Sequence, residues 1–467
     1  MRKFKKMINN KNTKAGGLYL AGNLFNKAIA FLTIPIFTRM MSTSDFGLVN
    51  TYLSWVSILS LIVGLSLGSS IRSAYKDFKD DLEGYVSSIF FLSFLNFVVT
   101  SSIIILISCF FIEELDILLV ALCLVQSYMT FVINSIDIKY MMSMDYIKKT
   151  LLLALPNVIT VIMSVVWLIN IENTKYLGRI LPFVIVTSVI GVYYLARSFI
   201  TGKKLIDKRY WKYAITLSIP LIFHGLSINI LATSDRTLLT IFRSSSEAGI
   251  YSLVYNLSMV AAVVTASLES VWIPWFNKKI HDGKKEIINQ SVALYIEIAL
   301  VVMVGILMIG PEVLVFMAPQ EYWSGNILIP PVVLASFFIF LYSISVNLEY
   351  YYKSTKVIAT NTIIAALVNL GLNFIFIPKY GALGAAYTTV AAYIISFVIH
   401  YRAARKLDKG LFPFRVYIKP ISWMFLSVGF TYVLMDYFLA RWSLALVGFG
   451  IYIIFSVKKG RFSSLLK

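Results

Sequence analysis

Residues 85–112 read YVSSIFFLSFLNFVVTSSIIILISCFFI and contain no charged side chain. Hydrocarbon offers no water to hydrogen-bond a peptide group, so a single segment crosses a bilayer as an α-helix, and about 20 apolar residues suffice. This stretch is longer than that minimum. It therefore predicts a transmembrane helix.

Similar apolar stretches recur along the whole chain of 467 residues, of which 58% are hydrophobic and 14% charged, with a mean hydropathy of +0.79. A soluble domain of this length would need far more polar surface. We therefore predict an all-α integral membrane protein with about 14 transmembrane helices. The predicted spans are 17–38, 47–69, 85–112, 115–137, 150–170, 180–200, 214–234, 249–275, 290–317, 327–349, 357–377, 382–401, 419–440 and 442–457. No small-residue cleavage site follows the first span, so we expect a retained helix rather than a signal peptide.

The formal net charge of +19 could suggest nucleic acid, but the basic residues stand in short clusters between apolar spans. With the N-terminus inside, 34 Lys and Arg fall on the cytoplasmic side, counting Arg197 and Lys419 at the cytoplasmic ends of their spans, and 7 fall in external loops, with Lys27 deeper inside a span. Cytoplasmic loops of membrane proteins carry such an excess. We therefore expect a multi-pass membrane protein with both termini in the cytoplasm and no nucleic-acid partner.

Three pairs of short motifs recur at a nearly constant spacing. STSDFG at 42–47 follows the first span, and SSSEAG at 244–249 follows the seventh, 202 residues later. The other pairs are SLGS at 66–69 with SLES at 267–270, and Lys175-Tyr176 with Lys379-Tyr380. This register predicts a duplication, with a six-helix bundle at 1–205, a second in parallel orientation at 206–405, and two additional helices at 406–467. Transporters built in this way rock two halves around a central site.

Several motifs resemble one known family. They are PIFTR at 35–39 followed by DFG at 45–47, TSDRTLL at 233–239 followed by EAGIY at 247–251, and NLGLN at 369–373 followed by IPKYGALGAA at 377–386. Over essentially its whole length, the chain resembles the polysaccharide-repeat-unit flippases, the O-antigen translocase branch of the multidrug/oligosaccharidyl-lipid/polysaccharide exporter superfamily. The resemblance implies a flippase of lipopolysaccharide and polysaccharide biosynthesis in the bacterial cytoplasmic membrane. Its substrate would be an undecaprenyl-pyrophosphate-linked oligosaccharide that passes from the cytoplasmic to the outer leaflet.

Charged groups within the spans are candidates for function, because each costs about 2.5–3.5 kcal/mol or more at a helix centre. Lys27 lies one turn after Asn23 on the same helical face. We expect these two residues to bind the pyrophosphate, with a structural ion pair of Lys27 as the alternative. Arg72 at the edge of the second span is a further phosphate candidate, although arginines often reach the interface from such positions.

A second group of ionisable residues suggests a gate or a coupling site. His224 and Asp235 share a face of the seventh span, with Arg236 beside Asp235, and Arg39 lies at the end of the first span. A salt-bridged helix end or a packing histidine is the structural alternative. Acids within spans would bind a coupling H⁺ or Na⁺, or pair with Lys27. These acids are Glu269, Glu297 and Glu349.

Polar side chains also follow helical spacing. Asn134 belongs to such a stripe in the fourth span, and Asn369 and Asn373 belong to one in the eleventh. Amides and hydroxyls suit a sugar head group if they face a cavity. Helix–helix packing is the alternative reading.

Catalytic motifs are missing from the sequence. It contains no phosphate-binding loop with a lysine, no zinc-binding helix and no paired cysteines, so we expect no enzyme activity, no metal and no cofactor beyond a coupling ion. A membrane glycan polymerase is disfavoured because the external loops are short. Other possible functions are a cation-coupled multidrug exporter and a lipid II flippase. The expected partners are the lipid-linked oligosaccharide, membrane lipids, and a glycan polymerase and chain-length regulator of the same pathway.

Overall fold

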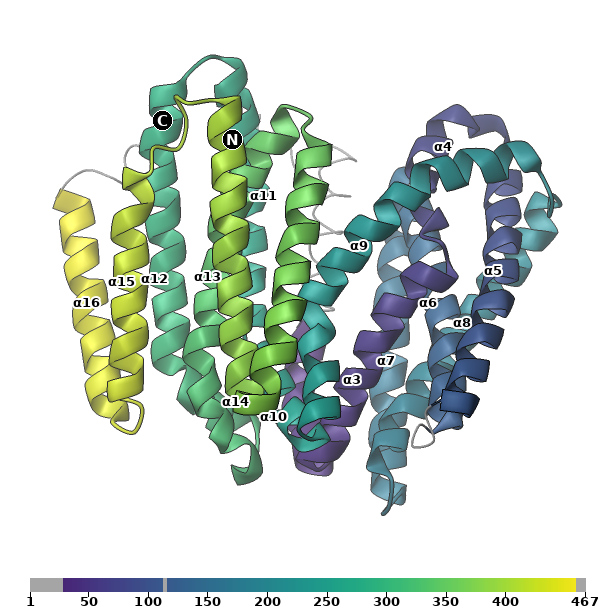
Figure 1. Ribbon diagram of the computed structural model, residues 1–467, viewed down its shortest axis with the longest axis horizontal. Helices are drawn as coiled ribbons and strands as arrows, with labels where there is room; N and C mark the ends of the chain where they lie inside the picture. Colours follow the sequence, from purple (N-terminus) through teal and green to yellow (C-terminus); the bar gives the residue numbers. More distant parts are fainter. Residues whose placement is uncertain (1–27, 112–115, 459–467) are drawn as a thin grey trace, which may run out of the picture. The chain divides into compact units, whose positions relative to one another are not determined.

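The computed structural model describes residues 28–111 and 116–458. In these ranges ten helices are long and apolar enough to cross a membrane, and the described regular structure is helical throughout. The helices after Ala28–Met40 are α3 (Thr43–Val63), α4 (Ile71–Asp77), α5 (Leu82–Phe111), α6 (Ile117–Met142), α7 (Tyr146–Asn170), α8 (Lys175–Gly202), α9 (Lys208–Phe242), α10 (Ser245–Leu257), α11 (Met259–His281), α12 (Lys285–Met317), α13 (Ile329–Tyr351), α14 (Thr355–Leu407), α15 (Arg415–Val433) and α16 (Phe438–Lys458) (Figure 1). Short 3₁₀ segments are η1 (Leu67–Ser70), η2 (Lys79–Asp81) and η3 (Gln320–Leu328). The predicted all-α membrane class is confirmed.

Some predicted boundaries were wrong. The span at 47–69 ends as an α-helix at Val63, because Leu65 and Ser66 adopt φ angles of 49° and 47°. The span at 419–440 is too long, since α15 ends at Val433 and α16 begins only at Phe438. The intervening residues are mostly apolar, so hydropathy did not mark the turn.

Gly381 divides the long helix α14 into the two spans that the sequence predicts there. It has φ 56° and ψ −138°, which is not helical and which a residue with a Cβ rarely adopts. A Cβ at this position would also lie 2.2 Å from Glu247 Oε2. Glycine is therefore required by the backbone, and any other residue would also displace the Glu247 carboxylate.

The described chain divides into two compact units, Met1–Ser234 and Asp235–Lys467, which we call the N-terminal and the C-terminal unit. In the N-terminal unit, α6 packs against α3, α5, α7 and α8. A Cβ at Gly191 of α8 would lie 2.7 Å from Met129 Sδ of α6, so glycine permits this close packing. On α6 the Tyr128 hydroxyl donates a hydrogen bond to Phe90 O of α5 (3.1 Å).

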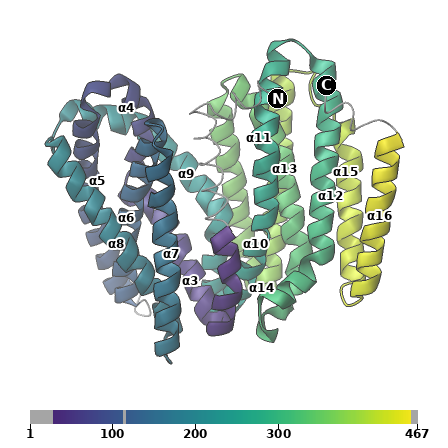
Figure 2. The same ribbon diagram turned by 180° about the vertical axis from the view of Figure 1, so that it is seen from behind.

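In the C-terminal unit, α13 is the central helix and packs against α11, α12, α14 and α15. The span that contains α13 is 72% buried, against 17% for the span that contains α5. Helices α15 and α16 both pack against α12. Figures 1 and 2 show these two helices at one end of the C-terminal unit. The two predicted additional helices are therefore part of the C-terminal unit.

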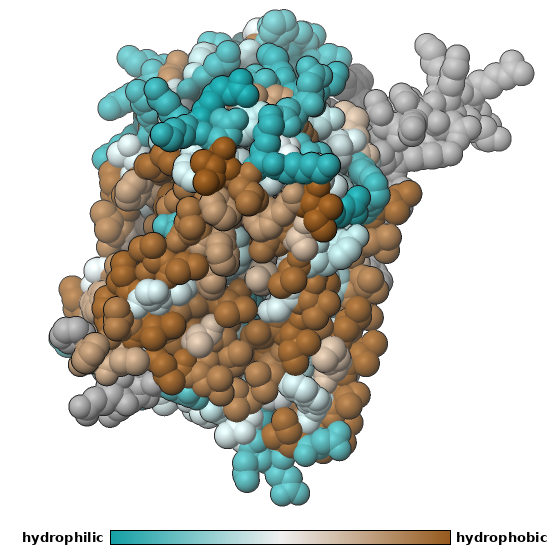
Figure 3. Space-filling model, turned by 90° about the vertical axis from the view of Figure 1, so that its right-hand side faces the viewer, coloured by the Kyte–Doolittle hydropathy of each residue, from teal (hydrophilic) through white to brown (hydrophobic). Residues whose placement is uncertain are grey.

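The outer surface is largely apolar. On α5, Val99, Ile103 and Leu106 are all more than half exposed. On the face drawn in Figure 3, hydrophobic residues form a broad band, and hydrophilic residues gather above and below it. Such a band would be unstable in water and suits the hydrocarbon layer of a membrane.

An acid in each repeated motif makes the same contact in its own unit. In the N-terminal unit, Asp45 Oδ1 accepts a hydrogen bond from the backbone N–H of Tyr176 at the start of α8 (3.2 Å). In the C-terminal unit, Glu247 Oε2 accepts one from the N–H of Ala382, just after the kink of α14 (3.1 Å). A carboxylate at a helix N-terminus satisfies an otherwise unpaired N–H and the helix dipole. We call these two contacts the acid latches.

Candidate functional site

Asp235 lies at the centre of a buried polar cluster in the C-terminal unit. Its side chain is 1% exposed. Asp235 Oδ1 accepts a hydrogen bond from Asn373 Nδ2 (2.5 Å), and Oδ2 accepts one from the Tyr251 hydroxyl (2.5 Å) and one from the Thr389 hydroxyl (2.8 Å). The carboxylate forms no ion pair with a described residue.

Further side chains complete this Asp235 cluster. Asn373 Nδ2 also donates to Asn369 Oδ1 (3.2 Å), and the Thr388 hydroxyl donates to Asn373 Oδ1. Asp235 comes from α9 and Tyr251 from α10, while the amides and the two threonines come from opposite sides of the α14 kink. The kink therefore brings two polar stretches of one helix to the same carboxylate.

The Asp235 cluster is suited to hold a proton or a small cation. An unpaired carboxylate is costly in a membrane, and buried acids of this kind mark ion or proton sites. The oxygen atoms of carboxylates, hydroxyls and amides are ligands that hard cations prefer. The sequence predicted Asp235, Asn369 and Asn373 in separate roles, whereas the structure brings them together. Tyr251, Thr388 and Thr389 were missed, although Tyr251 belongs to the EAGIY motif.

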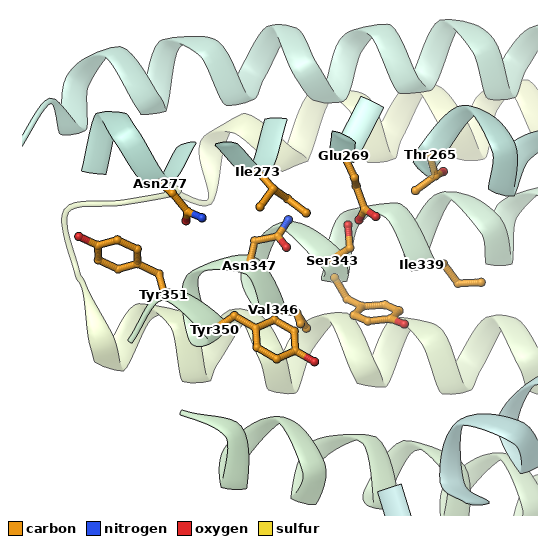
Figure 4. A pocket seen from close by; sticks show the side chains of 11 residues that line it. Thr265, Glu269, Ile273, Asn277, Ile339, Ser343, Val346, Asn347, Tyr350 and Tyr351 are labelled. Carbon is orange, nitrogen blue, oxygen red and sulfur yellow. The ribbon is translucent and has the colours of Figure 1, made fainter. Parts of the chain in front are cut away.

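A cavity of about 580 Å³ lies between α11 and α13 of the C-terminal unit. Glu269, Thr265 and Asn277 of α11 and Tyr342, Ser343 and Asn347 of α13 are among the residues that line it. Figure 4 shows the Glu269 carboxylate and the Ser343 side chain pointing toward each other across the cavity. Glu269 forms no hydrogen bond or ion pair with a described residue, so this predicted acid faces a space that a ligand can occupy.

The position equivalent to Glu269 in the first repeat is closed. Gly68 lies in η1, and a Cβ there would lie 2.2 Å from Ser135 Oγ of α6. The sequence alignment of SLGS with SLES already indicates that the halves differ here. In the structure, the N-terminal unit is closely packed at Gly68, whereas the C-terminal unit has a cavity at Glu269.

Glu349 is paired with a histidine that we did not predict. His400 Nδ1 of α14 lies 2.9 Å from Glu349 Oε2 of α13, and the two side chains are 1% and 0% exposed. The His400 ring stacks on Tyr342, which also lines the cavity (centroids 5.6 Å apart). Glu349 Oε1 has no hydrogen-bond partner among the described residues. The chain has only three histidines, and the position of His400 within an apolar stretch is a sequence signal that could have identified it.

A second ion pair that we did not predict lies near the C-terminal end of α12. Arg441 of α16 is completely buried and donates to Glu312 Oε1 of α12. Trp442 Nε1 donates to the other carboxylate oxygen (3.2 Å), and Arg441 Nη1 donates to Met435 O (2.8 Å). This ion pair attaches α16 to α12. The sequence gives no sign of this pair, because the two residues are 129 positions apart.

Asp408 anchors the loop after α14 near the tyrosines at one end of the cavity. Its carboxylate lies 2.8 Å from Lys285 Nζ and accepts hydrogen bonds from the Gly410 N–H (2.9 Å) and the Tyr352 hydroxyl (3.4 Å). Burial raises the pKa of Asp408, but these donors outweigh burial and hold its pKa below the usual range. The resulting stabilisation is present above the unfolded pKa of about 3.9 and is lost as the pH falls through the lower folded pKa.

The remaining predicted residues form none of the contacts described above, although Arg236 directly follows Asp235 in α9. Lys27 and Asn23 lie outside the described residues. Arg72, Asn134 and Arg39 are exposed, and Arg39 Nη1 donates to Pro35 O (3.0 Å). The other three are partly buried: His224 of the N-terminal unit, Arg236 over the Tyr255 ring (5.2 Å), and Glu297 on α12.

A comparison with protein families identifies residues 13–280 as a match to the family described as polysaccharide biosynthesis protein. "Lsg locus putative protein 1" of Haemophilus influenzae is 25% identical over 385 residues, which cover 79% of this chain and 93% of that protein. "Capsular polysaccharide biosynthesis protein CapF" of Staphylococcus aureus is 20% identical over 397 residues, which cover 81% and 96%.

Two solved structures show the same fold at low sequence identity. The lipid II flippase MurJ in an inward closed conformation has a TM-score of 0.67 and 16% identity, with 96% of this chain and 100% of that chain covered. An inward-facing multidrug resistance MATE family transporter has a TM-score of 0.59 and 14% identity, with 83% and 96% covered. The chain therefore has the all-helical fold of these transporters.

Proposed function

Because the chain belongs to the polysaccharide biosynthesis protein family, we propose that it is a flippase for undecaprenyl-pyrophosphate-linked oligosaccharide repeat units. It would move them from the cytoplasmic to the outer leaflet by alternating access, without enzymatic chemistry. The observation that carries this proposal is the polar cavity of Glu269 and Asn347 among membrane-spanning helices. Amide, hydroxyl and aromatic groups in such a place suit a glycan that crosses a membrane.

The pyrophosphate end of this substrate needs cations. We assign it to Lys27 and Arg72, with Asn23 and Asn134 as additional donors. Arg72 is exposed and forms no hydrogen bond or ion pair within the described ranges, so it is free to meet an anion. The prenyl chain would stay in the lipid against the apolar outer surface.

The Asp235 cluster would couple transport to a gradient of H⁺ or Na⁺. Its support is a carboxylate that three donors surround without an ion pair among the described residues. Exchange of these donors for a cation would change how α9, α10 and α14 are held together. The His400–Glu349 pair is the second place where a proton could be held.

The protein is a multi-pass membrane protein, and we place it in the bacterial cytoplasmic membrane with both termini in the cytoplasm. The excess of basic residues on one side supports this orientation. A glycan polymerase and a chain-length regulator of O-antigen or capsule assembly would act on the product outside.

Two related functions share the fold. A lipid II flippase would carry the same lipid pyrophosphate, and a multidrug exporter would instead need acids for cationic drugs. The family description and the capsule relative favour a polysaccharide precursor over both.

Complementation is the decisive experiment. Strains that lack their repeat-unit flippase and make different glycans should regain surface polysaccharide when this chain is expressed. A strain depleted of its lipid II flippase serves as the comparison. Rescue of the lipid II strain alone, or drug efflux without any surface polysaccharide, would contradict the proposal.

The Lys27→Ala variant tests the anion site. We expect export of the repeat unit to stop while the amount of protein in the membrane stays normal, because a neutral side chain cannot compensate a buried phosphate charge. Lys353→Ala, a loop variant after α13, serves as the control. Normal surface polysaccharide with Lys27→Ala would remove Lys27 from the site.

A further inference from the structure

The cavity between α11 and α13 presents one unused acceptor and one unused donor. The Glu269 carboxylate forms no hydrogen bond or ion pair with a described residue. Asn347 Nδ2 is buried and has no hydrogen-bond partner in the described ranges. Buried polar groups normally have partners, and leaving them unpaired is costly. The buried Asn347 amide, together with the partly exposed Glu269 carboxylate on the same cavity wall, therefore indicates a polar ligand.

The combination of groups restricts the chemistry of that ligand. An ammonium group or Na⁺ would satisfy the carboxylate of Glu269 but not the N–H donors of Asn347. A phosphate or carboxylate would accept from Asn347 but would be repelled by Glu269. A hydroxyl group donates and accepts, so neighbouring hydroxyls of one molecule can satisfy both side chains.

The rest of the wall favours a ring with hydroxyls rather than a small alcohol. The volume of about 580 Å³ exceeds the space that one hydroxyl group needs. The Ser343 hydroxyl already donates to Phe340 O (2.9 Å), so its lone pairs are free to accept. Tyr350 lines the cavity and is 54% exposed, so its ring supplies aromatic surface for the C–H groups of a pyranose (Figure 4).

We infer that this cavity of the C-terminal unit recognises a neutral, hydroxyl-rich sugar ring, with Glu269 and Asn347 as specificity residues. The inference rests on the proposed function and identifies the part of the chain that recognises the sugar of the substrate. The N-terminal unit has no equivalent, because Gly68 is packed against Ser135 at the matching position. The sugar site is thus a property of one half of the duplication.

Direct binding tests the inference. The full chain in lipid nanodiscs is titrated with a methyl hexoside, an amino-sugar glycoside with a free amine, a methyl hexuronide and NaCl, and binding is followed by saturation-transfer NMR. We expect the methyl hexoside to bind best. Glu269→Ala and Asn347→Ala should each weaken it roughly tenfold, the loss expected for a hydrogen bond to a charged or buried group.

Matched variants control for folding. Ser267→Ala changes an exposed residue of α11 whose hydroxyl donates a hydrogen bond to Val263 O. This variant should bind the hexoside like the wild type. Glu269→Gln and Asn347→Asp keep the shape of the side chain and should also weaken binding of the hexoside. Glu269→Gln replaces an acceptor oxygen with a donor, and Asn347→Asp replaces the donor with an acceptor. Absence of hexoside binding, unchanged binding in both alanine variants, or a preference for the amine, the uronide or Na⁺ would overturn the inference.

Transport separates this inference from the proposed function. If the wild type restores no surface polysaccharide in any strain, the proposed function fails. If the wild type restores it and Glu269→Ala and Asn347→Ala do so equally well for every glycan, the sugar site fails and the flippase function stands.

Discussion

At the scale of single residues, several ionisable side chains lie within the membrane-spanning helices, and most of them have partners. Glu349 pairs with His400, and Arg441 pairs with Glu312. Asp235 differs because its partners among the described residues are neutral donors, and Glu269 differs because it faces a cavity. The negative charges of these two acids are therefore not neutralised by an ion pair within the described residues and can act on a ligand or a coupling ion.

The role of Asp235 is tested by Asp235→Asn. An asparagine keeps the size of the side chain, and the hydroxyls of Tyr251 and Thr389 can rotate to accept from its amide. We expect the folded protein to persist, but transport driven by a pH or Na⁺ gradient in proteoliposomes to fall by at least about tenfold, because an amide carries no exchangeable charge.

Ser252→Ala is the matched control for Asp235→Asn. Ser252 is buried beside Tyr251, and its hydroxyl has no hydrogen-bond partner within the described ranges, so its loss should leave transport unchanged. Wild-type transport with the same H⁺ and Na⁺ dependence in Asp235→Asn would exclude the cluster as the coupling site.

The sequence predicted the polar residues better than it predicted their partners. Asp235, Glu269 and Glu349 stand out because each is an acid in an apolar span. Their partners lie far away in the chain, and a threonine or histidine in a helix has no feature that shows what it faces. Tyr251, Thr389 and His400 were therefore missed, since pairing depends on tertiary packing rather than on local pattern.

At the scale of helices, hydropathy located nearly every span because the bilayer sets both length and composition. It placed boundaries poorly where the turn is itself apolar. The turn before α16 is such a case, and the positive φ angles of Leu65 and Ser66 are another. Glycine at 381 marked the junction within α14, where the backbone demands it.

The attachment of α16 gives a prediction at this scale. Glu312→Leu leaves the completely buried Arg441 without its carboxylate and should destabilise the protein by about 3–5 kcal/mol. Arg441→Met should cost less, because Glu312 is 32% exposed and can be solvated. Thermal unfolding in detergent measures both variants.

The double variant Arg441→Met with Glu312→Leu provides the check on this ion pair. Replacement of a buried pair by apolar side chains is often neutral, so the double variant should recover most of the stability lost in Glu312→Leu. Equal melting temperatures for Glu312→Leu and the wild type would show that the pair does not hold α16.

At the scale of the whole molecule, the acid latches connect the first motif of each repeat with its last. Asp45 and Tyr176 belong to two motifs that the sequence argument paired, and Glu247 and Ala382 lie at or beside their counterparts. The motifs were individually weak in the sequence. Their meeting at one hydrogen bond in both units gives a physical reason for their common spacing.

The latches predict additive effects. Asp45→Ala and Glu247→Ala should each lower the free energy of unfolding by about 1 kcal/mol, and the double variant by about 2 kcal/mol, because the two contacts lie in separate units. Glu172→Ala, an exposed loop acid without a hydrogen bond in the described ranges, should have no effect. A strongly non-additive double variant would show that the two latches act on one another.

The closed space at Gly68 has a consequence for the history of the gene. Any side chain introduced there collides with Ser135, whereas loss of Glu269 empties a cavity of its acid. Recombination that copied one half of the gene over the other would therefore damage the product in either direction. With glycine at 68 and glutamate at 269, the two halves of the chain cannot replace each other at this position.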